Sequence, residues 1–212
     1  MVGVLALQGN FERHVRRLEA LGAPVCLLKD RREISALKGI VLPGGESTTL
    51  LKLADRPFRE ALKDAISGGL PTLATCAGLI LIAKHVSNPA QESLKLLDVD
   101  VSRNAYGRQV DSFIAQDLGW TAAGAQSLRQ CAERTKSESL RALLEAAPTR
   151  TIEGVFIRAP KITRVGNGVS TLMEQKGDPI LVQSGSIFAA TFHPEQSATA
   201  CEVHAAFLSF II

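Results

Sequence analysis

A single cysteine stands where a short apolar run meets an apolar helical stretch. The run 71–75 is expected to be a strand, Cys76 follows it, and the small residues Ala77 and Gly78 leave room for a tight turn into a helix. Such a nucleophile elbow exposes one reactive side chain and directs the following N–H groups at the atom it attacks. The helix N-terminus also favours a thiolate. A buried structural cysteine is the competing interpretation, and the strand–turn–helix context favours the nucleophile.

A second segment, 192–195, carries a histidine and a carboxylate two positions apart, after another apolar run. A cysteine nucleophile needs a base and a group that orients this base. If the chain is extended here, His193 and Glu195 project to the same side. Glu195 could then hold one ring nitrogen while the other faces Cys76. The alternative is a plain polar turn, and the presence of Cys76 favours the catalytic interpretation.

A glycine-rich turn at 43–47 follows a further apolar run. Gly44 and Gly45 allow the backbone to approach a ligand closely and to adopt either sign of φ. Backbone N–H groups of this turn and of Ala77 could therefore converge on a developing oxyanion. A phosphate cradle is the competing functional interpretation, but the Gly-x-x-x-x-Gly-Lys pattern is absent, and two glycines alone also fit an ordinary turn.

The first half of the chain alternates apolar runs with amphipathic stretches. Strands are expected at 2–7, 24–28, 39–42 and 71–75, and helices at 12–21 and 58–66. This alternation predicts a mostly parallel sheet with helices on both faces, in which ligands bind at the carboxyl ends of the strands. Three segments fall at such ends: Gln8-Gly9, the turn at 43–47, and Cys76.

The second half has a different pattern. Four strand-like runs joined by glycine-containing turns predict antiparallel additions to the sheet, at 151–157, 170–174, 179–183 and 186–192, with a closing helix at 199–210. Residues 116–150 are polar, with a helix expected near 137–146, and we interpret them as an insertion on the core. The 212 residues are otherwise expected to form one domain, 1–212.

Composition argues against several classes of function. The net charge of +3 and the scattered basic residues do not indicate nucleic-acid binding. No apolar run reaches eighteen residues, so no membrane span is predicted, and the N-terminus is more typical of a strand than of a signal peptide. The cysteine spacing indicates neither a zinc site nor a disulfide framework and fits a reducing cytosol.

The remaining cysteines and histidines are not expected to be catalytic. Three cysteines are expected to be small apolar fillers, namely Cys26, Cys131 and Cys201. Three histidines are expected to be solvated or capping groups, namely His14, His85 and His204.

Three motifs together resemble the class I, or triad, glutamine amidotransferases: Thr-Cys-Ala-Gly at 75–78, Pro-Gly-Gly-Glu-Ser-Thr at 43–48 and Phe-His-Pro-Glu at 192–195. Further segments narrow the resemblance to the glutaminase subunits of pyridoxal 5′-phosphate synthases. These are Leu-Ala-Leu-Gln-Gly at 5–9, Arg-Asn-Ala-Tyr-Gly-Arg-Gln-Val-Asp-Ser-Phe at 103–113 and Phe-Ile-Arg-Ala-Pro at 156–160. The resemblance covers nearly the whole chain except 116–150, and Ala74 stands where this family usually has glycine.

The resemblance implies a flavodoxin-like three-layer α/β fold with a Cys-His-Glu triad: Cys76 as nucleophile, His193 as base and acid, and Glu195 as the orienting carboxylate. It implies substrate contacts from Gly45, Glu46, Ser47, Arg103, Ile157 and Arg158. It implies an oxyanion and activation region of Gly44, Gly45, Ala77 and Gln8. A guanidinium fork suits the α-carboxylate of glutamine, but an ordinary surface ion pair is the alternative for Arg103 and Arg158.

The same resemblance implies hydrolysis of L-glutamine to L-glutamate and ammonia in the cytoplasm, with no cofactor and no metal. The ammonia would pass to a pyridoxal 5′-phosphate synthase subunit within a large hetero-oligomer. Two alternatives stay open, an amidotransferase subunit of another pathway and a catalytically silent regulatory module. The segment 103–113 argues against the first, and the intact triad argues against the second.

Overall fold

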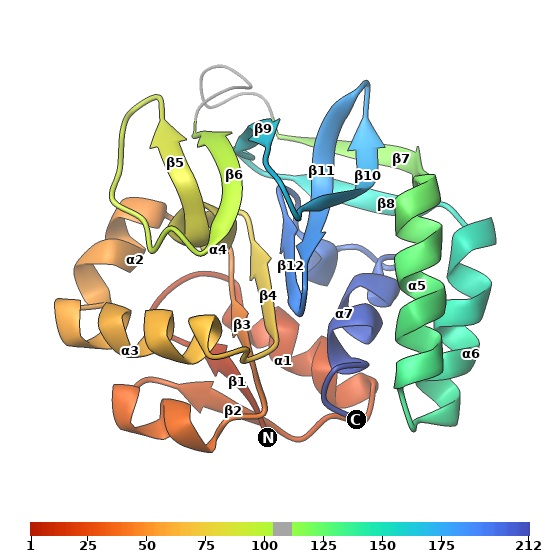
Figure 1. Cartoon of the computed structure of the whole chain (residues 1–212), viewed down its shortest axis with the longest axis horizontal. Helices are drawn as coiled ribbons and strands as arrows, with labels where there is room; N and C mark the ends of the chain where they lie inside the picture. Colours follow the sequence, from red (N-terminus) through yellow and green to blue (C-terminus); the bar gives the residue numbers. More distant parts are fainter. Residues whose placement is uncertain (104–111) are drawn as a thin grey trace.

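A seven-stranded sheet forms the centre of the computed structural model, which describes residues 1–103 and 112–212. The strand order is β10-β11-β12-β4-β3-β1-β2 (Figure 1). The strands are β1 Val2–Leu5, β2 Val25–Leu28, β3 Gly39–Leu42, β4 Thr72–Thr75, β10 Ser170–Gln175, β11 Asp178–Ser184 and β12 Ile187–Ala190.

The first four strands confirm the predicted alternation. They pair in parallel in the order β2-β1-β3-β4, and β1, β3 and β4 are buried along their whole length. Continuous burial is what a parallel strand shows when both faces of its sheet are covered.

Helices cover the two faces of this sheet and make three layers (Figure 1). They are α1 Phe11–Ala20, α2 Ser47–Leu53, α3 Arg56–Ser67, α4 Ala77–Ile82, α5 Ala122–Arg134, α6 Glu138–Ala146 and α7 Cys201–Leu208, with short 3-10 turns at η1 Arg31–Ala36, η2 Ala147–Thr149 and η3 Pro194–Gln196. Successive strand residues face opposite layers. Thus Val41 packs in the core with α1 and α7, while Leu42 packs in the core with α3 and α4.

Two smaller sheets, which the sequence did not predict, lie beside the central one. The first joins β5 Ala83–Ser87, β6 Leu97–Ser102 and β9 Lys161–Val165, and the second joins β7 Phe113–Leu118 to β8 Ile152–Phe156. The expected strand at 151–157 is therefore β8, and its assignment to the central sheet was wrong. It pairs antiparallel with β7 instead, where the rings of Phe113 and Phe156 stack with centroids 4.6 Å apart.

The central sheet gains antiparallel strands in the second half of the chain, as predicted. Its strand β12, however, has one antiparallel and one parallel neighbour. β10 and β11 pair antiparallel, and β11 and β12 also pair antiparallel. The other edge of β12 runs parallel to β4, with Ala190 opposite Thr75. The carboxyl ends of β4 and β12 consequently meet at the same side of the sheet.

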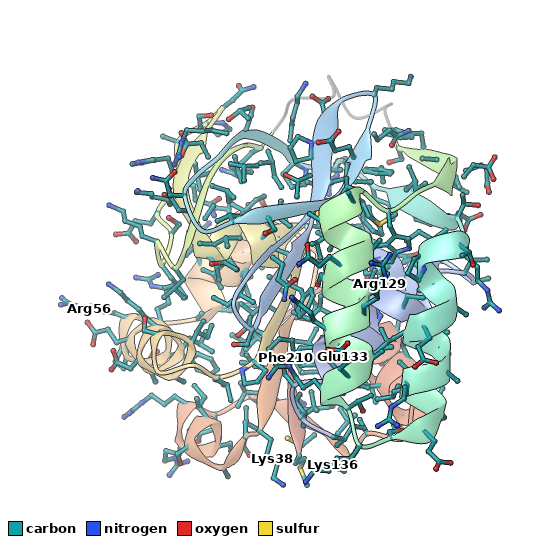
Figure 2. The ribbon with its side chains drawn as sticks, turned by 45° about the vertical axis from the view of Figure 1, so that its right-hand side comes forward. Lys38, Arg56, Arg129, Glu133, Lys136 and Phe210 are labelled. Atoms are coloured by element: carbon teal, nitrogen blue, oxygen red, sulfur yellow. The ribbon has the colours of Figure 1, made fainter. Side chains whose placement is uncertain are left out.

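Residues 116–150 contribute α5 and α6, which bury Leu128, Leu140 and Leu144 in the same core as α1 and α7. Figure 2 shows α5 in front, with the exposed side chains of Arg129 and Glu133 labelled. That this segment is an insertion stays a prediction. No helix within 1–103 and 112–212 is long and apolar enough to cross a membrane.

Candidate active site

Cys76 lies in a strained turn between β4 and α4. Its φ of 47° and ψ of −102° are unusual for a residue with a side chain. The Cys76 N–H donates to Ala190 O at 2.9 Å, which ties the turn to β12. Gly78 allows the turn to pack closely, because a Cβ there would lie 2.0 Å from the carbonyl oxygen of Leu42. The local geometry is that of a nucleophile elbow.

The parallel pairing of β12 with β4 brings the histidine segment to the cysteine. Since Ala190 lies opposite Thr75, the chain leaving β12 and the chain leaving β4 emerge side by side. His193 then follows, and its N–H donates to Val155 O of β8 at 2.9 Å. The small β7–β8 sheet therefore holds the backbone of the candidate base.

His193 and Glu195 form a short buried contact, with His193 Nδ1 2.7 Å from Glu195 Oε1. The side chains are 3% and 0% exposed, so water hardly competes for this bond. The extended backbone under which the two side chains would project to the same side is not what forms here: residues 194–196 form the 3-10 turn η3. The turn still brings the two groups together, because a bend over Pro194 shortens the path between them.

Burial and hydrogen bonding act against each other in the two acid–base groups. Burial lowers the pKa of the His193 imidazole, but hydrogen bonds to Cys76 and Glu195 and their charges raise this pKa well above its ordinary value. Burial raises the pKa of the Glu195 carboxyl, yet the neighbouring His14 and His193 bring this pKa below its ordinary value. The arrangement therefore favours a protonated imidazole next to the cysteine and an ionised carboxylate behind it.

The glycine turn after β3 packs directly against His193. A Cβ at Gly44 would lie 2.3 Å from His193 Cε1 and 3.1 Å from Cys76 Cβ, so only glycine fits there. Gly45 has a φ of 149°, and a Cβ on it would lie 2.1 Å from Gln8 Oε1. Gln8 Oε1 accepts the Glu46 N–H at 3.0 Å. The Gln8 side chain thus supports the turn from behind.

One cavity of about 200 Å³ collects most of the residues expected to bind substrate. Its lining residues include Cys76 and His193, together with Gly45, Glu46, Ser47, Arg103, Ile157 and Arg158. The other four expected site residues are not among the lining residues, namely Gln8, Gly44, Ala77 and Glu195. Among the described residues, the N–H groups of Gly45 and Ala77 have no hydrogen-bond partner.

The polar wall of this cavity has its own internal contacts. Glu46 caps α2, and its carboxylate accepts the N–H groups of Thr48 and Thr49. Burial raises the pKa of Glu46, but these hydrogen bonds outweigh it and lower the pKa to about 2. Arg103 Nη2 lies 3.7 Å from Glu46 Oε1 and donates to Thr48 Oγ1 at 3.0 Å. Arg103 is thus held at the cavity edge by an anionic partner.

The opposite wall comes from the end of β8. Ile157 is half-buried and Arg158 is exposed. Arg158 has a φ of 43°, which is uncommon for a residue with a long side chain. Strained backbone of this kind gathers at functional sites.

Sequence reasoning missed two residues that line this cavity, Asn10 and Ile80. Asn10 is the N-cap position of α1, and its N–H lies 3.4 Å from Gly44 O. Its place two residues after Gln8, in the loop that ends β1, is the signal that could have found it. Residues 104–111, which carried part of the family resemblance, lie outside the described residues.

The expectation that His14 and His204 are solvated or capping groups was wrong. Both are fully buried, and His14 Nδ1 lies 3.0 Å from His204 Nε2. His14 lies four residues before the buried Leu18 on α1, so helical periodicity places it on the buried face. His85 is exposed on β5, which confirms the expectation of a solvated histidine.

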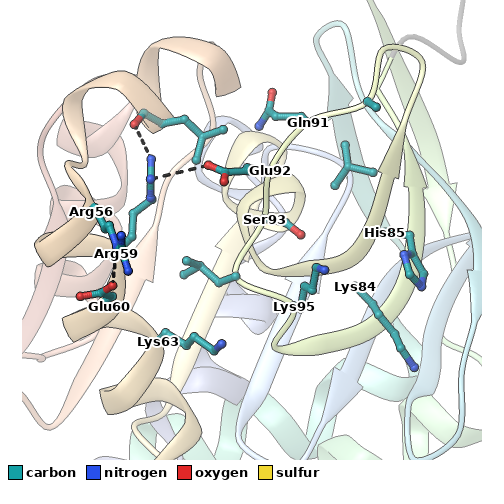
Figure 3. A pocket seen from close by; sticks show the side chains of 14 residues that line it. Arg56, Arg59, Glu60, Lys63, Lys84, His85, Gln91, Glu92, Ser93 and Lys95 are labelled. Carbon is teal, nitrogen blue, oxygen red and sulfur yellow. Dashed lines mark hydrogen bonds and ion pairs between the residues drawn. The ribbon is translucent and has the colours of Figure 1, made fainter.

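A larger hollow of about 920 Å³ lies beside α3 and β5 and contains none of the candidate catalytic residues (Figure 3). Several of its charged groups pair with one another: Arg56 with Glu60, and Arg59 with Glu92. Gln91 at its rim accepts a hydrogen bond from Ser47 Oγ at 2.9 Å, which links the hollow to the site. We therefore identify the smaller cavity as the candidate active site, because Cys76 and His193 both line it.

Comparisons with known proteins agree on one family. The family model described as the SNO glutamine amidotransferase family matches residues 4–121 and 127–212. A protein named pyridoxal 5′-phosphate synthase subunit PdxT from Solibacter usitatus is 43% identical over 210 residues, 98% of this chain and 97% of the relative. The protein of the same name from Koribacter versatilis is 40% identical and covers 99% and 95% of the two chains.

Solved structures agree with the fold. A structure described as a glutamine amidotransferase aligns with a TM-score of 0.79 and 35% identity, over 99% of this chain and 97% of the other. A glutamine amidotransferase structure from Thermotoga maritima aligns with a TM-score of 0.57 at 12% identity, over 92% of this chain and 75% of the other. The second likeness concerns the fold alone.

Proposed function

This chain belongs to the SNO glutamine amidotransferase family, and from that premise we propose that Cys76, His193 and Glu195 hydrolyse L-glutamine to L-glutamate and ammonia. The observation that carries these roles is the buried contact of 2.7 Å between His193 Nδ1 and Glu195 Oε1, placed beside a cysteine in a nucleophile elbow. A histidine held in this way has one nitrogen committed to the carboxylate and the other available to the thiol.

The first half of the reaction forms a thioester. The Cys76 thiolate attacks the side-chain amide carbon of glutamine, and a C–S bond forms as the carbonyl oxygen becomes an oxyanion. His193 holds the proton taken from the thiol and delivers it to the amide nitrogen. The C–N bond then breaks, ammonia leaves, and a γ-glutamyl thioester remains on Cys76.

The second half regenerates the enzyme. Water attacks the thioester carbon while His193 accepts a proton from this water. The C–S bond breaks, glutamate leaves, and the proton returns to the Cys76–His193 pair. Glu195 stays ionised throughout and stabilises the imidazolium.

We assign recognition of glutamine to the residues of the cavity wall. Arg103 binds the α-carboxylate, since it is the cavity arginine with the smaller exposure, 15% for its side chain. The carboxylate of Glu46 lies in the same wall and suits the α-ammonium group of the substrate. Gly45 and Ser47 contact the substrate from the turn, and Ile157 and Arg158 close the cavity from β8.

The oxyanion is stabilised by backbone N–H groups of the Gly44-Gly45 turn and of Ala77. Support for this assignment is that the N–H groups of Gly45 and Ala77 have no partner among the described residues. Gln8 holds the turn through the Glu46 N–H. A glycine peptide can reorient at small cost. The oxyanion hole is therefore completed when binding of a partner protein fixes the orientation of the Gly44-Gly45 peptide.

The relatives named as subunits of pyridoxal 5′-phosphate synthase indicate where the ammonia goes. We propose that this chain docks on a synthase subunit in a cytoplasmic hetero-oligomer and delivers ammonia for pyridoxal 5′-phosphate formation. Coupling release to the partner would prevent loss of free ammonia.

The experiment that tests this function measures glutamate release from L-glutamine by the purified chain, alone and with the synthase subunit. We expect low turnover alone and strong stimulation by the partner. An electrophilic glutamine analogue should label Cys76 and leave the other three cysteines unmodified. Absence of glutamate release under both conditions would refute the proposal.

A further inference from the structure

Behind the triad, two histidines continue the chain of contacts into the core. Glu195 offers one oxygen, Oε1, to His193, while its second oxygen, Oε2, lies 3.3 Å from His14 Nε2. His14 Nδ1 lies 3.0 Å from His204 Nε2. The side chains of His14 and Glu195 are both 0% exposed, and His204 is also fully buried.

His14 also touches the residue before the nucleophile. Thr75 Oγ1 lies 3.3 Å from the same nitrogen, His14 Nε2. His14 Nε2 thus lies between the elbow and the carboxylate, and Glu195 Oε2 has this nitrogen as its near neighbour but no formed hydrogen bond among the described residues. Catalytic hydrogen bonds in unliganded sites often have this geometry and tighten when substrate binds.

The protons of this chain can be assigned from the network. An ionised Glu195 only accepts, so the His14 tautomer that can bind Oε2 is the one with its proton on Nε2. His14 Nδ1 is then an acceptor and receives the Nε2–H of His204. His204 Nδ1 is left as a lone pair, and it has no partner among the described residues. An unpartnered lone pair is a smaller penalty than an unpartnered N–H.

Burial disfavours a positive charge on both imidazoles. Burial lowers the pKa of His14, and the attraction of Glu195 offsets this only in part. Burial also lowers the pKa of His204 well below its ordinary value. A neutral His14 can therefore present a directed donor to Glu195 without a second positive charge beside His193.

We propose that His14 is a positioning residue for the reaction: its Nε2–H holds Glu195 so that Oε1 faces His193, and His204 selects the required His14 tautomer. Helices α1 and α7 are thus part of the catalytic support, although neither supplies a group that touches glutamine. The inference rests on the proposed glutaminase activity.

The central test compares His14→Gln with His14→Asn in the complex with the synthase subunit. Glutamine carries an amide N–H within reach of the Nε2 position, whereas asparagine carries it near the Nδ1 position. We expect His14→Asn to lower kcat about 10- to 100-fold, as for loss of a hydrogen bond to a charged group. His14→Gln should stay within about threefold of the unmodified chain. KM should not change, because His14 does not line the cavity.

A matched control separates positioning from stability. Leu18→Ala removes a fully buried side chain from the same helix, so it should lower Tm and leave kcat of the folded protein unchanged. Equal kcat for the two His14 variants, or a loss for Leu18→Ala as large as that for His14→Asn, would overturn the inference. If His14→Asn does not fold, His204→Asn removes the donor to His14 Nδ1, and an unchanged kcat there would overturn it as well.

A readout independent of turnover keeps the two proposals distinguishable. Nitrogen chemical shifts of the imidazole rings report the tautomer, and we expect His14 protonated at Nε2. Protonation at Nδ1 would overturn the positioning role even in a fully active enzyme. Absence of glutamine hydrolysis by the unmodified complex would instead refute the proposed function.

Discussion

The front and the rear of the candidate triad are built in opposite ways. At the front, facing the cavity, Cys76, Gly45 and Arg158 all have positive φ. At the rear, Glu195, His14 and His204 are buried side chains that contact one another in sequence. The front depends on unusual backbone conformations, and the rear depends on packing.

This difference has a consequence for mechanism. Strained backbone at a cavity persists only while its surroundings hold it, and it can change when a partner or substrate binds. Buried side chains in a close-packed core have fewer alternatives. We therefore expect regulation to act on the front and the orientation of the base to be set from the rear.

The largest expected effect is at the nucleophile. Cys76→Ala should abolish glutamate release, with a loss on the order of 10⁴-fold or more, because no other thiol lines the cavity among the described residues. The variant should fold normally, since Cys76 to alanine removes only one sulfur atom. Unaltered thermal unfolding together with lost turnover would establish this. Surviving activity would remove Cys76 from the mechanism.

The next largest effects are expected for the two members of the acid–base pair, His193 and Glu195. His193→Asn should reduce kcat more than Glu195→Gln, because the imidazole transfers protons whereas the carboxylate orients and stabilises it. Steady-state kinetics at saturating glutamine give the two values. A lower kcat for Glu195→Gln than for His193→Asn would show that Glu195 does more in the reaction than orient His193.

A smaller effect is expected at the cavity wall. Arg103→Ala should raise KM for glutamine about thirtyfold, equivalent to about 2 kcal/mol for one charged hydrogen-bonded contact, with less effect on kcat. Arg56→Ala is the matched control, since Arg56 is an exposed arginine paired with Glu60 outside this cavity. An unchanged KM for Arg103→Ala would favour its ordinary ion pair with Glu46.

The smallest effect should be at the support of the glycine turn. Gln8→Ala removes the acceptor of the Glu46 N–H, a loss of one ordinary hydrogen bond. We expect kcat of the partner-stimulated enzyme to fall about two- to tenfold, with KM less affected. The stimulation ratio, measured with and without the synthase subunit, checks this. Equal stimulation in the variant would mean that the turn does not act as the switch.

Local patterns along the chain predicted the strand ends and turns at the front of the candidate site. The strands ending at Leu42 and Thr75 were placed correctly, and the first strand ends at Leu5, two residues before its predicted end, because short apolar runs bounded by glycine and proline are local signals. The elbow at Cys76 and the turn at Gly44-Gly45 follow from the same signals, since parallel strands present their carboxyl ends at one edge.

The pairing of the second half could not be predicted in the same way. The strand at 151–157 pairs with β7, and β12 pairs with two neighbours of opposite direction. Strand periodicity states which face of a strand is buried, but it carries no information about which strand lies beside it.

The α/β alternation, the elbow at Cys76, the glycine turn and the short spacing of His193 and Glu195 can all be read from the sequence, because each depends on residues close together in the chain. The meeting of His193 with Cys76, and the place of His14 and His204 behind Glu195, follow from the packing of distant segments. His14 and His204 are 190 positions apart. Their contact exists because α1 and α7 pack on the same face of the sheet, and the free energy of that packing belongs to the whole core.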